Sequence, residues 1–467
     1  YEAKRSEATK QAAARKRKAA GIKKGGKGFV SSKKQARRAK VGTRSKAIAM
    51  MAALGVDEIE IDRRAVAHLM RRQKRAGTVD AWLPGYRTEP AEVKRRRLRK
   101  VTDYEEVNKA MEEAIGLRML LEPKGDGRLK GRLICLGYQE PYWWDKGSTD
   151  SPVASMATVR TLLFRNGDAE DVVSSVDVAT AFLQAEEYGP GERKRYVKYK
   201  PHPKAEVEYY GLLGPIYGQR SASKAWYKTL ASWLTSKEQG YCQGDNEPCL
   251  FKKGNLQLVI YVDDIIARGP RAETEAFYRE LEKKFKIKDP TILTDEVALR
   301  FLGFDIKKDG ERYSIDQEDA IEKFLISAEV VDKRVESPMP TAKLLYEDDN
   351  ELGEEQAQQY RSRVGSLNYF SSASRYDIAL ATSRLSQKAH KPTVSAWRAM
   401  ERVLQYMQCN PHVVISGVRG QGKDVMETYS DSDHGGDKPH VMRSQTGSLI
   451  LLNGVPVYWC SKKQTDT

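Results

Sequence analysis

Hydrophobic and polar positions recur with two different periods along this chain, and each period predicts a different element. Short β-branched runs such as "LQLVIYVDDIIARGP" (256–270) indicate buried strands, in this case a hairpin with two adjacent acids at its tip. Apolar residues at every third or fourth position indicate amphipathic helices. Helices are predicted over residues 103–121, 155–167, 178–185, 221–238, 271–287, 354–374, 376–390 and 394–408.

The strands and helices alternate in an order that predicts an α+β fold, with helices on one side of a sheet. Further strands are predicted at 128–139, 172–177, 299–316, 426–436 and 446–463. The strand segment 299–316 is expected to turn at Asp309-Gly310, and the segment 446–463 at Asn453-Gly454, because both dipeptides suit tight hairpin turns. Residues 341–410 are helical in pattern, and the strands after 426 indicate a new domain.

Charge is distributed unevenly along the chain. Residues 1–100 hold 30 Lys and Arg against 9 Asp and Glu, a net charge of +21, whereas residues 101–467 carry a net charge of −5. The first 50 residues contain almost no large apolar side chains, which predicts a largely disordered arm. Its basic runs, including "VKRRRLRK" (93–100), indicate a nucleic-acid contact or a nuclear-import signal, and a solvated tail is the alternative.

The remaining bulk properties exclude several classes of protein. The five cysteines are scattered and form no C-x-x-C pair, which excludes a zinc knuckle or a disulfide framework and fits a reducing compartment. No run of 18 apolar residues occurs, so no membrane span or membrane partner is expected. The chain begins at Tyr1 without a signal peptide, and we expect it to be a fragment of a longer protein.

Three acids stand at strand ends beside apolar residues. Asp177 ends the strand of "VVSSVD", and Asp263 and Asp264 form the hairpin tip. On the hairpin alone, acids that serve only as turn residues are an equal alternative. Ionised carboxylates beside apolar walls are costly unless compensated, and Mg²⁺ prefers hard oxygen ligands together with substrate phosphates. If the two strands are neighbours, the acids predict a two-metal site for phosphoryl transfer.

A set of motifs in fixed order then resembles a known family. "GRLICLGYQ", "SSVDVATAFLQA", "PIYGQRSASKAWY", "YVDD", "FLGFDIKKDG", "YRSRVGSLNYF", "WRAMERVLQYMQ" and "YSDSDHGGD" follow one another over residues 120–467. Together they resemble the reverse transcriptase region of copia-type retrotransposon Pol polyproteins, with the start of an RNase H domain. The resemblance implies a right-hand polymerase with an antiparallel palm sheet, followed by a truncated RNase H-like α/β domain.

The resemblance also implies roles for individual residues. Asp177, Asp263 and Asp264 match the catalytic, metal-binding acids, and the backbone of Val178 is an added ligand for Mg²⁺, two ions of which are expected, with Mn²⁺ as a substitute. Phe182 matches the aromatic ring that excludes a 2′-hydroxyl from the sugar of the incoming nucleotide, with a core aromatic as the alternative. Nucleotide-site residues are also implied in the fingers strand and before the helix at 221: Arg132, Lys130 and Ser221. For the basic residues of the fingers strand, a solvated surface charge is an equal alternative.

Two departures from the family pattern qualify this picture. Ser221 stands where the family has Gln and Ser223 where it has Pro, and Leu136 replaces a usual Lys.

Asp431 matches the first metal-binding acid of RNase H, while Asp433 and Asp437 are expected to be surface acids. Because the other RNase H acids would follow the end of this sequence, we expect no RNase H activity from this chain.

The expected organisation is a basic arm (1–100), fingers and palm (101–340), a helical thumb and connection (341–425), and the first RNase H-like strands (426–467). The expected function is RNA-directed DNA synthesis with an RNA template, a DNA primer, an RNA/DNA hybrid and deoxynucleoside triphosphates. A diverged nucleic-acid-binding relic and a basic scaffold protein are the alternatives. An intracellular location is expected, in a virus-like particle or the nucleus; the sequence leaves the oligomeric state open.

Overall fold

The computed structural model describes residues 92–123, 129–144, 147, 149–200, 206–339, 345, 350–433 and 443–465. The chain divides into two units, of which the first comprises residues 1–86, 119–131 and 199–208. Few residues of that first unit are described. The second unit comprises residues 87–118, 132–198 and 209–467, and it contains the elements on which the following sections depend.

A five-stranded sheet has the strand order β1-β6-β5-β2-β3. Its strands are β1 (Leu98–Lys100), β2 (Ile115–Pro123), β3 (Leu129–Cys135), β5 (Tyr196–Tyr199) and β6 (Glu208–Leu212). Helix α5 (Tyr104–Glu113) connects β1 to β2, and the short 3-10 turns η4 (Gly137–Gln139) and η5 (Tyr142–Trp144) follow β3.

Two sequence predictions are wrong in this region. The predicted helix 103–121 ends at Glu113, and Ile115 begins β2, because the apolar residues after 114 are consecutive and suit a strand better than one face of a helix. The arm was predicted to extend to residue 100, but residues 98–100 pair with β6. The basic arm up to residue 91 lies outside the described residues.

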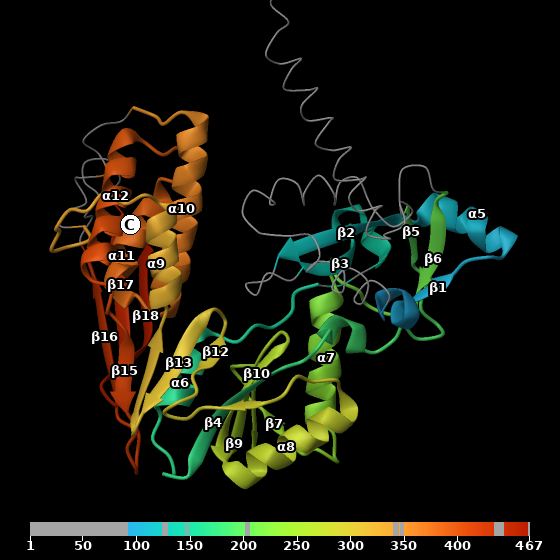
Figure 1. The fold of residues 1–467 in the computed structure, drawn as a ribbon, viewed down its shortest axis with the longest axis horizontal. Helices are drawn as coiled ribbons and strands as arrows, with labels where there is room; N and C mark the ends of the chain where they lie inside the picture. The colour runs from blue at the N-terminus through green and yellow to red at the C-terminus, as the bar shows by residue number, and fades with distance from the viewer. Residues whose placement is uncertain are drawn as a thin grey trace, which may run out of the picture. The chain divides into compact units, whose positions relative to one another are not determined.

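The second sheet is antiparallel and has six strands in the order β11-β4-β10-β9-β8-β7 (Figure 1). Its strands are β4 (Asp171–Asp177), β7 (Cys242–Gln243), β8 (Leu250–Lys253), β9 (Leu256–Tyr261), β10 (Asp264–Pro270) and β11 (Thr291–Ile292). Helices α7 (Ala222–Leu234) and α8 (Arg271–Lys284) pack on one face. The side chains of β9 and β10 alternate between two hydrophobic clusters, so both faces of the sheet are covered.

The opposite face of this sheet packs on α6 (Met156–Phe164) and on a third sheet, ordered β12-β13-β14-β15. Its strands are β12 (Leu299–Phe301), β13 (Phe304–Asp309), β14 (Arg312–Asp316) and β15 (Ile415–Val418). The turn at Asp309-Gly310 is confirmed, with Gly310 at φ 58°. The segment 299–316 holds three strands rather than the predicted two, because Leu302 and Gly303 form a further turn.

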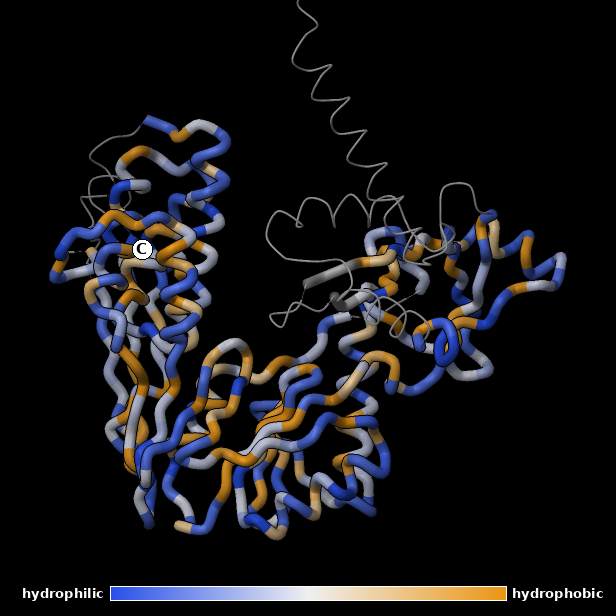
Figure 2. Tube along the Cα trace, in the orientation of Figure 1, coloured by the Kyte–Doolittle hydropathy of each residue, from blue (hydrophilic) through white to orange (hydrophobic). Residues whose placement is uncertain are grey.

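The segment between β14 and β15 is helical, and three of its helices match those predicted from the periodicity of residues 341–410, whereas the first, α9, was not predicted. It contains α9 (Glu318–Ser327), α10 (Glu354–Ala373), the 3-10 turn η8 (Tyr376–Ile378), α11 (Ala379–Gln387) and α12 (Val394–Cys409). Their buried apolar faces form one cluster that includes Tyr360, Leu367 and Met400. Hydrophobic and hydrophilic segments alternate along the chain in the hydropathy colouring of Figure 2.

A fourth, three-stranded sheet ends the described chain, with the order β16-β17-β18. Its strands are β16 (Met426–Ser432), β17 (Gln445–Leu452) and β18 (Val455–Lys463). The predicted turn at Asn453-Gly454 is confirmed, because both residues have positive φ. Arg160 of α6 holds this sheet by donating to the carbonyl oxygen of Val457 while its guanidinium lies 3.8 Å from the ring centroid of Trp459.

Candidate active site at the tip of the acidic hairpin

The strands that carry the three predicted acids are neighbours. β10 pairs with β4 in an antiparallel register that sets Asp264 directly opposite Asp177. β10 also pairs with β9 in a hairpin whose two turn residues are Val262 and Asp263. The backbone N–H of Val178 donates to the carbonyl oxygen of Asp263 at 2.8 Å, which closes the same end of the sheet. Asp177 and Asp264, 87 positions apart in the sequence, are therefore brought together by strand pairing.

Burial and nearby negative charge both act on the pKa of Asp264. Burial, followed by the charges of Asp263 and Asp177, raises the pKa of Asp264 from 3.8 to about 6. Lys288 opposes this rise, and its Nζ lies 2.7 Å from Oδ2 of Asp177. An additional positive charge at this end of the sheet would relieve the repulsion, and the oxygen donors present are those that Mg²⁺ prefers.

The arrangement does not by itself form a complete metal centre. Among the described residues, no group of three or more His, Cys, Asp or Glu side chains is arranged to hold a metal ion. Asp177 and Asp264 face each other, whereas Asp263 is exposed on the turn. Asp177 and Asp264 are the two carboxylates at this end of the sheet that could hold a divalent ion together with water and substrate phosphates.

The hairpin tip is strained and held from outside. Val262 has φ 56°, a conformation that a β-branched residue rarely adopts. Its carbonyl oxygen accepts a hydrogen bond of 2.7 Å from Nε1 of Trp226, a buried residue of α7 whose ring packs edge-on against Phe285. Such strain persists only where surrounding packing enforces it, and it concentrates at functional sites. The quoted motif contained Trp226, but its role at the tip was not predicted.

Phe182 lies in the 3-10 turn η6 (Ala181–Gln184), which follows β4 after Thr180 at φ 53°. The predicted helix 178–185 is therefore wrong: only this four-residue turn forms, because the left-handed Thr180 interrupts any helix that would start at Asp177. The Phe182 ring is half-buried and lies 5.4 Å from the ring of Tyr217, measured between centroids.

Arg132 of β3 also lies near the ring of Tyr217. Its guanidinium carbon lies 5.7 Å from the centroid of the Tyr217 ring, and the N–H of Cys135 donates to the carbonyl oxygen of Tyr217 at 2.7 Å. Tyr217 thus joins Arg132 to Phe182, a role that the sequence did not reveal. Ser221 is the residue before α7, and Lys130 lies in β3 with a side chain outside the described residues.

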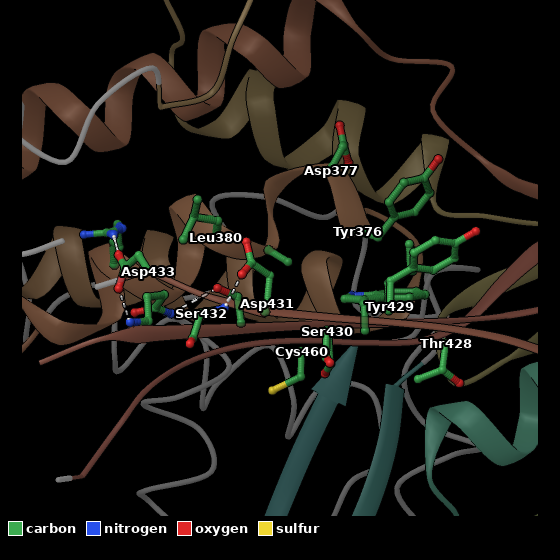
Figure 3. Close-up of a pocket in the computed structure, with 18 residues that line it drawn as sticks. Tyr376, Asp377, Leu380, Thr428, Tyr429, Ser430, Asp431, Ser432, Asp433 and Cys460 are labelled. Carbon is green, nitrogen blue, oxygen red and sulfur yellow. Dashed lines mark hydrogen bonds and ion pairs between the residues drawn. The ribbon is translucent and has the colours of Figure 1, made fainter. Parts of the chain in front are cut away.

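A second candidate region surrounds Asp431 (Figure 3). A cavity of about 880 Å³ lies between the three-stranded sheet and the segment of η8 and α11, and Asp431, Asp433, Leu380 and Trp459 line it. Asp431 is exposed on β16, and its Oδ1 accepts the N–H of Ser432. Asp433, expected to be a surface acid, is paired with Arg384 at 3.2 Å and accepts the N–H of Gln445. Asp437 lies outside the described residues.

Comparison of the sequence with known families identifies the family of this chain. Residues 104–342, more than half of the chain, match the family described as "Reverse transcriptase (RNA-dependent DNA polymerase)". The chain belongs to this family. The resemblance predicted from the motifs is thereby confirmed for the reverse transcriptase region, and the fold is a mixed α/β one with several sheets.

The chain is 30% identical over 365 residues to the "Retrovirus-related Pol polyprotein from transposon RE2" of Arabidopsis thaliana, covering 75% of this chain and 24% of that protein. It is 28% identical over 371 residues to the "Retrovirus-related Pol polyprotein from transposon TNT 1-94" of Nicotiana tabacum, covering 74% and 26%. The chain thus spans about a quarter of the length of these relatives.

One solved structure shares a distant likeness. It is titled "Structure of the foamy viral protease-reverse transcriptase dRH in complex with ds DNA.", and it matches with a TM-score of 0.45 at 11% identity, covering 91% of this chain and 68% of that chain. A likeness at this level carries no argument about function. Across the described ranges, no helix is both long and apolar enough to cross a membrane.

Proposed function

We propose that this chain is an RNA-directed DNA polymerase that extends a DNA primer on an RNA template. The observation that carries the proposal is the register that pairs Asp177 with Asp264, with Asp263 on the adjoining turn. In the reaction, the primer 3′-hydroxyl would attack the α-phosphate of a deoxynucleoside triphosphate. The new P–O bond would form as the bond to the β-phosphate oxygen breaks and pyrophosphate leaves.

Asp177 and Asp264, with Asp263 and the backbone of Val178, are the groups that would hold Mg²⁺ or Mn²⁺. Two such ions would supply positive charge for the attacking and leaving oxygens when bound. The side chains of the protein would contribute position: Phe182 would lie under the sugar, and Arg132, aided by Lys130, would bind phosphate oxygens through its guanidinium fork. Ser221, at the start of α7, replaces a larger Gln and would leave template and nucleotide less constrained.

The test is incorporation of dTTP on poly(rA)/oligo(dT) with Mg²⁺. We expect wild type to extend the primer and Asp264→Asn or Asp263→Asn to lose at least about 100-fold in rate, because electrostatic stabilisation contributes that much at such sites. Asp289→Asn, an exposed acid on the same loop as Lys288, is the matched control and should retain activity. Equal incorporation by wild type and the hairpin variants would reject the assignment.

The second reading is a relic that binds nucleic acid without turnover, favoured by Ser221, Ser223 and Leu136, which depart from the family pattern. Binding of the primer-template with a steep salt dependence, but no synthesis in Mg²⁺ or Mn²⁺, would support this reading. The intact juxtaposition of the three acids favours the polymerase.

We further propose that β16–β18 are RNase H-like strands and that this chain does not cleave the RNA of a hybrid. Asp431, which matches the first metal-binding acid of RNase H, is exposed on β16, and metal-assisted cleavage would need further acids around the ion. Incubation with a labelled RNA/DNA hybrid and Mg²⁺ should leave the RNA intact. Cleavage that disappears in Asp431→Asn would contradict this expectation.

A further inference from the structure

Arg97 belongs to the basic run that was interpreted from the sequence as a nucleic-acid or nuclear-import motif, yet its side chain is only 4% exposed. Its Nη2 donates to the carbonyl oxygen of Leu183 at 2.8 Å and to that of Ala185 at 2.5 Å. A side chain so enclosed is not available to a polyanion. Arg97 instead connects the segment before β1 to the turn that carries Phe182.

The two carbonyl groups lie just after Phe182 in the chain, and Leu183 and Ala185 are themselves buried. The opposite side of η6 is fixed by Gln184, which donates to the carbonyl oxygen of Ala179 at 2.7 Å and accepts the N–H of Lys286 at 2.7 Å. A 3-10 turn of four residues has little stability of its own. The place of Phe182 therefore depends on these side-chain contacts from distant parts of the chain.

The chain around Arg97 is shaped to receive its guanidinium. A Cβ on Gly214 would lie 2.2 Å from Nη1 of Arg97, so any larger residue at 214 would displace the side chain. The N–H of Leu213 donates to the carbonyl oxygen of Arg97 at 2.9 Å, which fixes the backbone as well. Glu187, with Oε1 3.8 Å from Nη1, provides the opposite charge.

We infer that Arg97 is a positioning residue that sets the place of the Phe182 ring and thereby the preference of the active site for deoxynucleotides over ribonucleotides. This inference rests on the proposed polymerase function. A single guanidinium nitrogen, Nη2, donates to both main-chain carbonyls, and a lysine side chain of the same charge ends one bond short of that position. Loss of these two bonds would let η6 shift, and sub-ångström shifts matter at a site that discriminates by sterics.

The experiment compares incorporation of dTTP and UTP on poly(rA)/oligo(dT), with kcat/KM measured for each. Arg97→Lys is expected to lower the dTTP-to-UTP ratio about 10-fold. Arg95→Lys is the matched control, because Arg95 lies two residues away with a side chain that is 73% exposed, and its ratio should equal that of wild type. Gly214→Ala displaces Nη1 while keeping Arg97, so it gives an independent variant if Arg97→Lys fails to fold.

A double variant separates positioning from general damage. If Arg97 acts through Phe182, then Phe182→Val combined with Arg97→Lys should have the same dTTP-to-UTP ratio as Phe182→Val alone, within about 2-fold. An unchanged ratio in both Arg97→Lys and Gly214→Ala, with dTTP and UTP rates falling equally, would overturn the inference. A wild type that incorporates neither nucleotide would instead overturn the proposed function.

Discussion

The surroundings of Asp264 disfavour its ionised form. Burial and two neighbouring carboxylates raise its pKa to about 6, so near neutral pH the folded chain must hold three negative charges at one end of a sheet. Lys288 compensates only part of this charge, and it does so from an exposed position. The same repulsion that destabilises the fold makes the site receptive to a cation.

The pH dependence of stability follows from the direction of this shift. Because the folded pKa of Asp264 lies above its ordinary value of 3.8, the folded state binds more protons between pH 3.8 and about 6, and its stability falls as pH rises through that window. Asp264→Asn removes the charge at constant shape. We expect this variant to have a higher melting temperature than wild type at pH 8 and the advantage to disappear near pH 4.

Thermal unfolding of both proteins at pH 4, 6 and 8, without divalent ions, measures this difference. Asp289→Asn is the control, because Asp289 is exposed and should show no such pH-dependent gain. A melting temperature of Asp264→Asn that is lower than that of wild type at pH 8 would contradict the repulsion argument.

At the scale of elements, helix α7 supports the hairpin tip. Trp226 and Trp233 both pack edge-on against Phe285, with ring centroids 5.2 and 5.5 Å away. Only Trp226 has a hydrogen bond from its indole to the strained tip among the bonds found in the described residues. The helix therefore contributes one contact to the core and a different one to the site.

Trp226→Phe should separate these two contributions. It removes the donor to the Val262 carbonyl and should cost about 1 kcal/mol from the lost hydrogen bond, besides the smaller ring. We expect the rate of dTTP incorporation to fall much more than in Trp233→Phe, which changes a half-buried ring that packs on the same Phe285 and leaves the bond from Trp226 in place. Urea unfolding and kcat for both variants provide the measurement. Equal losses of rate in the two variants would show that the bond to the tip has no catalytic importance.

The sequence predicted the elements whose pattern is long and regular. The helices of 354–409 and the hairpin at 256–270 have one clear period and well-marked turns, so their existence followed from local sequence. The segment 115–121 was misassigned because an apolar run after a helix does not reveal where the period changes. A helix was predicted over 178–185 in place of the short turn η6, because the left-handed backbone of Thr180 that interrupts the helix is not visible in the sequence.

The acids of the candidate site were predictable from the sequence. The neutral and basic residues that contact them or their neighbours were not. Three acids at strand ends are unusual enough to be noticed in a sequence. Tyr217, Lys288 and Arg97 carry no such signal, because their importance arises from contacts with residues far away in the chain. The basic run even misled in the case of Arg97, since a buried arginine and a solvated one look the same in a sequence.

At the scale of the whole molecule, the boundary between the basic N-terminal arm and the folded chain differs from the one predicted. Residues 98–100 pair with β6 and Arg97 is buried, so the structured chain begins before the predicted boundary at 100. Most of the positive charge of residues 1–100 lies before residue 92 and can be removed without touching these contacts.

Deletion of residues 1–91 should therefore weaken nucleic-acid binding and reduce its dependence on salt while polymerase activity survives, because fewer phosphate contacts release fewer counterions. Binding to the primer-template over a range of KCl concentrations gives the slope. Deletion of residues 1–100 is the comparison, and it should lose activity because it removes β1 and Arg97. Loss of activity in the shorter deletion would mean that the arm is itself part of the working enzyme.

The strand β15 returns the chain to the sheet that it left at β14, with Arg312 opposite Val418 and Ile315 opposite Ile415. Helices α9 to α12 therefore lie in one insertion, which leaves the sheet after β14 and returns to it at the neighbouring strand β15. Cleavage of the chain between α11 and α12 would therefore leave two fragments that stay connected through the pairing of β14 with β15.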